Sequence, residues 1–103
     1  MCADPDNRAI LAELAGAIAG VALLHGSGEV RLFYVSPECV RSGVGRALLR
    51  ALEAEARDCQ MTSLKLESSL TARQFYERHG FVSTGDSIPH FGVLRGYPYA
   101  KAI

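Results

Sequence analysis

The sequence has no excess of charge of either sign, because 11 Lys and Arg residues balance 11 Asp and Glu residues. This balance argues against a dedicated nucleic-acid-binding protein, which usually has a basic surface. A long apolar segment is also lacking, since the longest uncharged apolar run, Leu14–Leu24, is too short to span a bilayer. The N-terminal residues MCADPDNR are polar and acidic, unlike a signal peptide. We therefore expect no nucleic-acid partner and no membrane association.

Cysteine is scarce, with three residues in the chain: Cys2, Cys39 and Cys59. An odd number of cysteines without a metal-like spacing predicts neither a disulfide framework nor a zinc site. We therefore expect reduced thiols in a cytoplasmic protein, and no bound metal.

The size and composition of the chain predict one soluble domain. Its 103 residues, 49% of them apolar, are enough for a modest single core. The polar start, which contains Pro5 and Asn7, predicts a disordered segment over residues 1–8. Residues 9–103 then form the single folded domain.

Hydrophobic patterning predicts the order of the elements. Residues 9–24 allow helix or strand, but their glycines favour a hairpin of strands Ile10–Leu14 and Ile18–Leu24. Branched and aromatic residues predict a strand at Glu29–Val35. A strand is next expected at Thr62–Glu67, followed by a helix at Ala72–His79 that is capped by Ser69 or Thr71 and ended by Gly80. Turns are expected at residues 84–86 and 88–89. The last strands are expected at His90–Leu94 and Tyr97–Lys101, with Pro98 restricting one edge.

The stretch Tyr34–Ala56 leads from the end of a strand through a glycine-containing turn into an amphipathic helix. Apolar residues recur every four positions from Val44 onward, which predicts a helix with one buried face. Gly43 and Gly45 stand at its start, where the first N–H groups have no partner within the helix and attract anions. From the residues alone, a phosphate site and a tight turn without a ligand both stay open.

This helix would connect two parallel neighbouring strands by a right-handed crossover, whereas the early hairpins are antiparallel. The expected fold class is therefore α+β, a mixed sheet with helices packed on it.

Two segments, VRSGVG at residues 40–45 and ARQFYERHGF at residues 72–81, resemble the GCN5-related N-acetyltransferase (GNAT) superfamily. The first is similar to the acetyl-CoA loop of that family, and the second to its later helix signature. The resemblance implies a mostly antiparallel sheet with a central splayed strand pair and two packed helices. It also implies a short form, which lacks the usual N-terminal strand and the two helices that shape the acceptor pocket.

The resemblance further implies that backbone N–H groups of the loop bind the CoA pyrophosphate, and that the preceding strand hydrogen-bonds the pantetheine arm. Two residues depart from the family pattern, because Val40 replaces the usual Gln or Arg and Ser69 replaces a common Asn. The implied acetyl-CoA-binding residues are Phe33, Tyr34, Val35, Arg41, Ser42, Gly43, Val44, Gly45 and Arg46.

Tyr76 falls on the position that often protonates the departing CoA thiolate, a role that suits a phenol with a pKa of about 10. Glu29 aligns with the glutamate that acts as general base in some members of the family. The alternatives are that Tyr76 packs in the core beside Phe75, and that Glu29 is a solvated residue opening a strand. The other proton acceptors with a suitable intrinsic pKa are His25, His79 and His90.

The implied reaction is transfer of an acetyl group from acetyl-CoA to a primary amine by direct attack in a ternary complex. A covalent route through Cys39 is the chemical alternative, with only Arg41 nearby in sequence to activate the thiol. The alternative function is a non-catalytic acyl-CoA-binding or regulatory module, which the short N-terminal region favours. Apolar sheet surface left exposed by that shortening would favour a homodimer.

Overall fold

The computed structural model describes residues 7–90 and 94–103. Its first sheet is antiparallel with the order β1-β2-β3, formed by β1 (Arg8–Leu14), β2 (Ala17–Leu24) and β3 (Val30–Val35). The predicted hairpin is thus confirmed. The first strand begins one residue before the predicted boundary at residue 9, and Nη1 of Arg8 lies 2.6 Å from Oε2 of Glu55 on the first helix.

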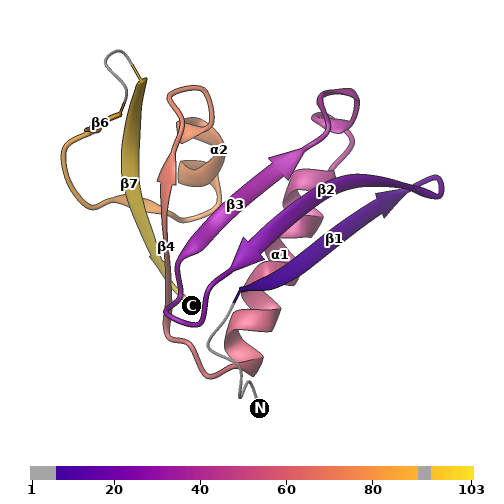
Figure 1. Ribbon diagram of the computed structural model, residues 1–103, viewed down its shortest axis with the longest axis horizontal. Helices are drawn as coiled ribbons and strands as arrows, with labels where there is room; N and C mark the ends of the chain where they lie inside the picture. The colour runs from indigo at the N-terminus through magenta and orange to yellow at the C-terminus, as the bar shows by residue number, and fades with distance from the viewer. Residues whose placement is uncertain (1–6, 91–93) are drawn as a thin grey trace.

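A short 3₁₀ turn, η1 (Pro37–Cys39), and the long helix α1 (Val44–Asp58) follow β3, and Figure 1 shows α1 lying behind the first sheet. The predicted apolar repeat of α1 is buried, with Leu48, Leu52 and Ala56 each 1% exposed or less. Leu49 and Glu53, which lie outside that repeat, are buried as well. Gly20 lets helix and sheet approach closely, because a Cβ there would lie 3.2 Å from Cδ2 of Leu48 and 3.0 Å from the carbonyl of Tyr34. The helix therefore fixes the end of β3 and the loop after it.

The second sheet is formed by β4 (Ser63–Ser68), β5 (Val82–Ser83), β6 (Ile88–His90) and β7 (Leu94–Ala102), with α2 (Arg73–Arg78) between β4 and β5. The long strand β7 pairs antiparallel with the other three. The predicted turn at residues 88–89 is wrong, because these residues belong to β6. The predicted strand His90–Leu94 falls partly outside the described residues.

Pro98 lies in β7, the middle strand of the second sheet, and restricts pairing on one edge of that strand, as predicted. It is paired with Glu67 of β4, and its carbonyl accepts a hydrogen bond from the N–H of Thr84 at 3.0 Å. In an antiparallel strand the N–H and C=O of one residue point to the same side. The missing proline N–H therefore faces the position where β5 has just ended, and the ladder with β4 loses no hydrogen bond.

β3 and β4 are parallel neighbours that touch at one end and then diverge (Figure 1). The contact is an isolated parallel bridge between Glu29 and Lys65, in which the N–H of Lys65 donates to the carbonyl of Gly28 at 3.0 Å. Beyond this point the two strands belong to separate sheets. The predicted fold class, an α+β fold with a splayed strand pair and two packed helices, is confirmed.

α2 is one residue shorter at each end than the predicted helix, and its two termini are stabilised differently. Gly80 has a φ of +93°, and the N–H of Phe81 donates to the carbonyl of Tyr76 at 3.0 Å, so the predicted glycine stop is confirmed. The predicted side-chain cap is wrong, because the N-cap residue is Ala72 and no side chain caps it. The hydroxyls of Ser69 and Thr71 lie 3.4 Å from each other instead.

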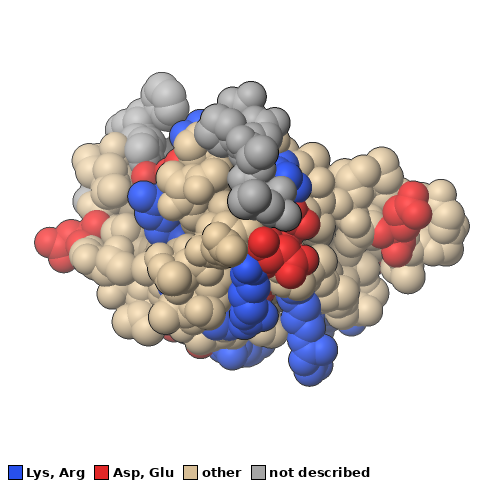
Figure 2. All heavy atoms as spheres, turned by 90° about the horizontal axis from the view of Figure 1, so that it is seen from below, with Lys and Arg blue, Asp and Glu red and all other residues tan. Residues whose placement is uncertain are grey.

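The surface carries mixed charge, and Figure 2 shows Lys and Arg interspersed with Asp and Glu on the face seen from below. Within the described part of the chain, no helix is long and apolar enough to cross a membrane. Cys39 is a free thiol, whereas Cys59 is disulfide-bonded, so the expectation of a reduced thiol is wrong for Cys59. Cys2 lies outside the described residues.

Candidate active site

The loop before α1 presents backbone donors that the helix itself does not use. Gly43 is the N-cap residue with a φ of +85°, and the first hydrogen bond of the helix runs from the N–H of Ala47 to the carbonyl of Gly43 at 3.1 Å. The N–H groups of residues 44–46 therefore have no partner within α1. No side chain caps the helix, and a Cβ added at Gly43 would meet no atom within 4 Å. The cradle is open and fits an anionic group.

Ser42 makes the turn that precedes these donors. Its N–H donates to the carbonyl of Cys39 at 3.1 Å, and its hydroxyl donates to the same oxygen at 2.6 Å. The Ser42 N–H is thus used within the turn, and the other predicted donors, those of residues 41 and 43–46, remain for an anion. The side chains of Arg41 and Arg46 are exposed beside them and add positive charge.

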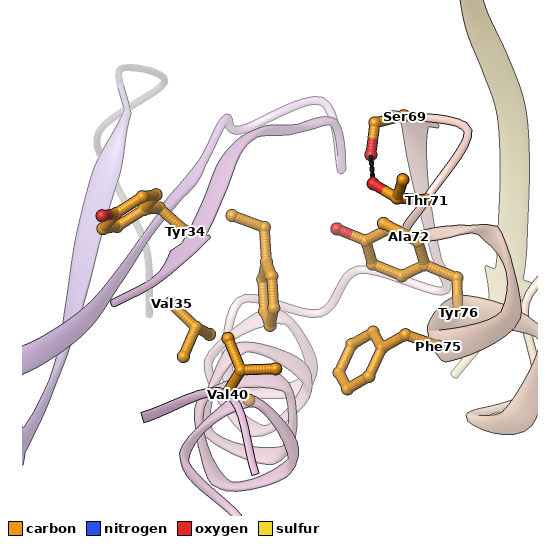
Figure 3. Close-up of a pocket in the computed structure, with 10 residues that line it drawn as sticks. Tyr34, Val35, Val40, Ser69, Thr71, Ala72, Phe75 and Tyr76 are labelled. Atoms are coloured by element: carbon orange, nitrogen blue, oxygen red, sulfur yellow. Dashed lines mark hydrogen bonds between the residues drawn. The ribbon is translucent and has the colours of Figure 1, made fainter. Parts of the chain in front are cut away.

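A cavity of about 530 Å³ lies between β3, the loop and α2. It is formed where β3 and β4 diverge, and Figure 3 shows the Tyr76 hydroxyl pointing into it, toward β3. Gly45 keeps this space open at the start of α1, because a Cβ there would lie 3.3 Å from the ring of Phe75. The cavity is lined by Phe33, Tyr34, Val35, Val40, Gly45, Ser69, Thr71, Ala72, Phe75 and Tyr76.

Tyr76 combines the two interpretations that the sequence left open. Its ring is 6% exposed and packs edge-on against Phe33, Phe75 and Phe81 at centroid distances of 5.9, 5.4 and 5.5 Å. Burial raises the pKa of the Tyr76 phenol to about 12. Tyr76 is therefore a core residue and also a protonated donor at the cavity wall at neutral pH.

A polar clamp that the sequence did not reveal holds α2 against β7. Nε of Arg73 donates to the hydroxyl of Tyr99 at 3.0 Å, and that hydroxyl donates to Oε2 of Glu77 at 2.5 Å. Tyr99 is 1% exposed, and the guanidinium of Arg73 stacks on the ring of Tyr97 at 4.3 Å. The hydrogen bond from Arg73 to Tyr99 raises the pKa of Arg73. Only the i,i+4 spacing of Arg73 and Glu77 was visible in the sequence.

Glu29 is not brought together with Tyr76. Its Oε1 accepts a hydrogen bond from Nε of Arg31 at 2.9 Å, at the end where β3 and β4 still touch. Glu29 does not line the cavity described above. It also does not line a second, smaller cavity, which Tyr76 borders as well. Its role as a base stays a prediction that this position does not favour.

The histidines lie at three separate places. His79 stacks on Phe75 at 4.6 Å, and burial together with the positive charges of Arg46 and Lys101 lowers the pKa of His79. His25 lies in the turn before β3, where its Nδ1 is 2.8 Å from the hydroxyl of Ser27. The side chain of His90 lies outside the described residues. Among the described residues, no cluster of His, Cys, Asp or Glu could hold a metal ion.

Four of the predicted acetyl-CoA residues and Tyr76 thus border one cavity, and the remaining predicted residues belong to the loop and the first turn of α1. The four are Phe33, Tyr34, Val35 and Gly45. The arrangement puts unused N–H donors beside a mostly apolar cavity and a phenol donor on its wall. It suits a ligand with a phosphate group and a long, mostly apolar arm.

Known proteins share both this sequence and this fold. A family model described as an acetyltransferase (GNAT) domain matches residues 1–102. The chain is 31% identical over 96 residues to an IAA acetyltransferase from Azospirillum brasilense, an alignment that covers 85% of this chain and 63% of that protein. A GCN5-related N-acetyltransferase from Rhodopseudomonas palustris superposes with a TM-score of 0.85 at 26% identity, over 94% of this chain and 62% of that one.

A GNAT family acetyltransferase from Elizabethkingia anophelis, solved with acetyl-CoA bound, has the same fold, with a TM-score of 0.79 at 17% identity. That superposition covers 95% of this chain and 77% of the other. The chain spans less than two thirds of the length of the relatives from A. brasilense and R. palustris. The family match nevertheless extends over nearly all of its residues and agrees with the splayed strands and the glycine loop. The chain belongs to the GNAT acetyltransferase family.

Proposed function

We propose that the protein transfers an acetyl group from acetyl-CoA to a primary amine by direct attack in a ternary complex. The observation that carries the proposal is that Gly45, whose N–H is one of the unused donors at the start of α1, and Tyr76 line the same 530 Å³ cavity. The family to which the chain belongs and the acetyl-CoA bound by the E. anophelis protein support it.

The loop and β3 would hold the acyl donor. The N–H groups of residues 43–46 donate to the pyrophosphate, and the positive end of the α1 dipole favours its charge. Beyond the bridge at Glu29, the edge of β3 that faces β4 has no ladder partner among the described strands. The backbone of Phe33, Tyr34 and Val35 can therefore hydrogen-bond the amides of the pantetheine arm.

Tyr76 would serve the chemical step. In that step a nitrogen–carbon bond forms and the carbon–sulfur bond of the thioester breaks. One proton leaves the amine, and one must reach the departing sulfur. Tyr76 would supply the proton for the sulfur, since its hydroxyl points into the cavity and a phenol is protonated at neutral pH. Cys39 borders neither cavity, which favours direct attack over a covalent route through its thiol.

A homodimer in the cytoplasm is part of the same proposal. The face of the first sheet turned away from α1 exposes large apolar side chains, with Leu11 at 56% and Leu32 at 42%. A second copy would cover this face. Sedimentation velocity at high micromolar concentration should show a dimer, and a monomer under those conditions would remove the second copy from the proposal.

A thermal-shift experiment combined with an assay of thiol release tests the function. We expect acetyl-CoA to raise the melting temperature, because a ligand at 100 times its Kd adds about 2.7 kcal/mol to the free energy of unfolding. We also expect thiol release with at least one amine of a broad panel. Stabilisation without turnover would favour the alternative, a non-catalytic acyl-CoA-binding module. Absence of any shift would contradict both functions.

A further inference from the structure

A second cavity, of about 260 Å³, borders Tyr76 and lies along the gap between β3 and β4. It shares Phe33, Ser69, Ala72 and Tyr76 with the first cavity and has its own residues from both strands. A molecule in it would approach the same phenol from a different direction than a ligand of the α1 loop. Its volume is below the range of about 300–1,000 Å³ that is usual for drug-sized ligands, so it suits a small molecule.

A β-bulge turns one basic side chain toward this cavity. Leu23 pairs with Leu32 and Leu24 pairs with Val30, which leaves Arg31 as the extra residue of β3. Val30 is 7% exposed on the side of α1, whereas the Arg31 side chain is 48% exposed on the opposite face. Bulges of this kind often re-aim a side chain beside a functional site.

An acidic side chain stands at the matching position of β4. The bridge pairs Glu29 with Lys65 in parallel, and Arg31 and Glu67 each stand two residues beyond it and line the second cavity. The burial of β4 alternates, with Leu66 turned inward and Glu67 outward. Because the strands diverge here, the two charged residues line the cavity between them.

Arg31 and Glu67 bring one positive and one negative side chain to the cavity, and its other walls are mostly apolar. Arg31 also donates from Nε to Glu29 at 2.9 Å, which orients the guanidinium and leaves its terminal nitrogens for another acceptor. The remaining lining residues are Val30, Leu32, Phe33, Leu66, Ser69, Ala72 and Tyr76.

We propose that this second cavity is the acceptor site and that the acceptor is a small amino-acid-like molecule, with its amine toward Glu67, its carboxylate toward Arg31 and an apolar side group between the walls. The inference rests on the proposed acetyltransferase function. A carboxylate matches the planar fork of Arg31, and an ammonium matches the carboxylate of Glu67. A diamine would instead bring a second cation against Arg31, which costs free energy.

Matched acceptors test the inference with the full chain and saturating acetyl-CoA. The probes are alanine, valine, leucine and methionine, each beside its amide, and 1,4-diaminobutane. We expect kcat/KM from thiol release to be at least tenfold higher for at least one amino acid than for its amide. Equal values within all four pairs, or a preference for the diamine, would overturn the inference.

Variants locate the two contacts. Arg31→Gln should lower kcat/KM at least tenfold for the preferred amino acid and less than threefold for its amide, and Arg31→Lys should restore part of the loss. Glu67→Gln should lower kcat/KM for both. The matched controls Arg78→Gln and Glu13→Gln change exposed residues outside both cavities and should have no effect. Equal losses for acid and amide in Arg31→Gln would contradict the carboxylate contact.

Failure of the inference is distinguishable from failure of the proposed function. If thiol is released with amines regardless of a carboxylate, the function stands and the inference falls. If no amine releases thiol, saturation-transfer NMR with the same four amino acids and their amides still tests the cavity. Selective binding of an amino acid that is lost in Arg31→Gln supports the site, and absence of such binding overturns it.

Discussion

The two helices beside the first cavity are held by different forces. α1 has 15 residues and packs an apolar face onto the first sheet, where its leucines are almost fully buried. α2 has six residues, of which only Tyr76 is buried, and it is tied to β7 through the hydroxyl of Tyr99. Apolar burial is non-directional and tolerant, whereas hydrogen bonds fix an orientation. The molecule thus combines a robust helix that presents binding groups with a small helix whose angle is set by polar contacts.

Because the two helices are held differently, we expect α1 to determine cofactor affinity and α2 to determine turnover. The N–H donors of residues 43–46 are backbone groups whose positions follow from helix geometry, so they tolerate side-chain variation such as Val40 in place of Gln or Arg. The Tyr76 hydroxyl lies at the end of a side chain, so its position depends on how α2 is seated. Substitutions at the start of α1 should therefore change affinity, and substitutions in α2 or its clamp should change turnover.

The largest expected effect is a loss of acetyl-CoA affinity when the start of α1 is altered. Gly43→Glu places a carboxylate and a side chain in the anion cradle, and like charges at such close range cost several kcal/mol. We expect the Kd for acetyl-CoA to rise roughly 100-fold or more, measured by titration calorimetry. Gly43→Ala is the control, because a Cβ meets no atom within 4 Å there and adds only the strain of a positive φ, about 1–2 kcal/mol. Normal affinity in the glutamate variant would remove the loop from the proposed site.

The role of α2 in turnover is tested by Tyr76→Phe, which keeps the ring in its aromatic cluster and removes the proton donor. A positioned general acid contributes about 10²–10⁴-fold, so we expect kcat to fall by roughly 100-fold. The affinity for acetyl-CoA should change little, since the binding groups lie on α1 and β3. Equal turnover in the variant would exclude Tyr76 as the acid.

The structure around α1 could be predicted from the sequence far better than the contacts that hold α2, for a physical reason. The periodicity from Val44 and the glycines before it are local, so they predicted the helix, its buried face and its open donors. Tyr99 contacts Arg73 and Glu77 across 26 and 22 residues, and no local pattern encodes such a pairing. The same holds for β7, whose partners only the folded chain reveals, and for the bulge at Arg31, which depends on the register with β2.

The clamp itself is tested by Tyr99→Phe, which keeps the buried ring but removes the hydroxyl that bridges Arg73 and Glu77. Hydrogen bonds to charged groups contribute about 1.5–3 kcal/mol, and the two charged side chains can partly re-pair. We expect the free energy of unfolding to fall by about 2 kcal/mol in urea titration, with kcat reduced more than the affinity for acetyl-CoA. Tyr97→Phe is the matched control, because Arg73 stacks on the ring of Tyr97, which that variant keeps. Equal losses in both variants would contradict the clamp.

The burial of Tyr76 on α2 also predicts that the free energy of unfolding depends on pH. The folded-state pKa of about 12 lies above the ordinary value of 10.0, so the unfolded chain releases this proton first as the pH rises. Its contribution to stability is therefore lost between about pH 10 and pH 12. From pH 9 to pH 11 the wild type should lose about 1.3 kcal/mol of unfolding free energy relative to Tyr76→Phe, measured by urea titration at each pH. A constant difference between the two proteins would contradict the raised pKa.

The smallest expected effect concerns Glu29, which belongs to neither helix and borders neither cavity. The family resemblance implies a general base here, and loss of a base would lower kcat by about 100-fold or more. The structure instead places the carboxylate in an exposed ion pair with Arg31, an interaction that contributes about 0–1 kcal/mol. Glu29→Gln keeps an oxygen that can accept the Arg31 hydrogen bond, so we expect kcat to fall less than threefold. A fall of 100-fold, with the acid limb of the pH profile abolished, would establish Glu29 as the base and would require the acceptor to approach from the closed end of the strand pair.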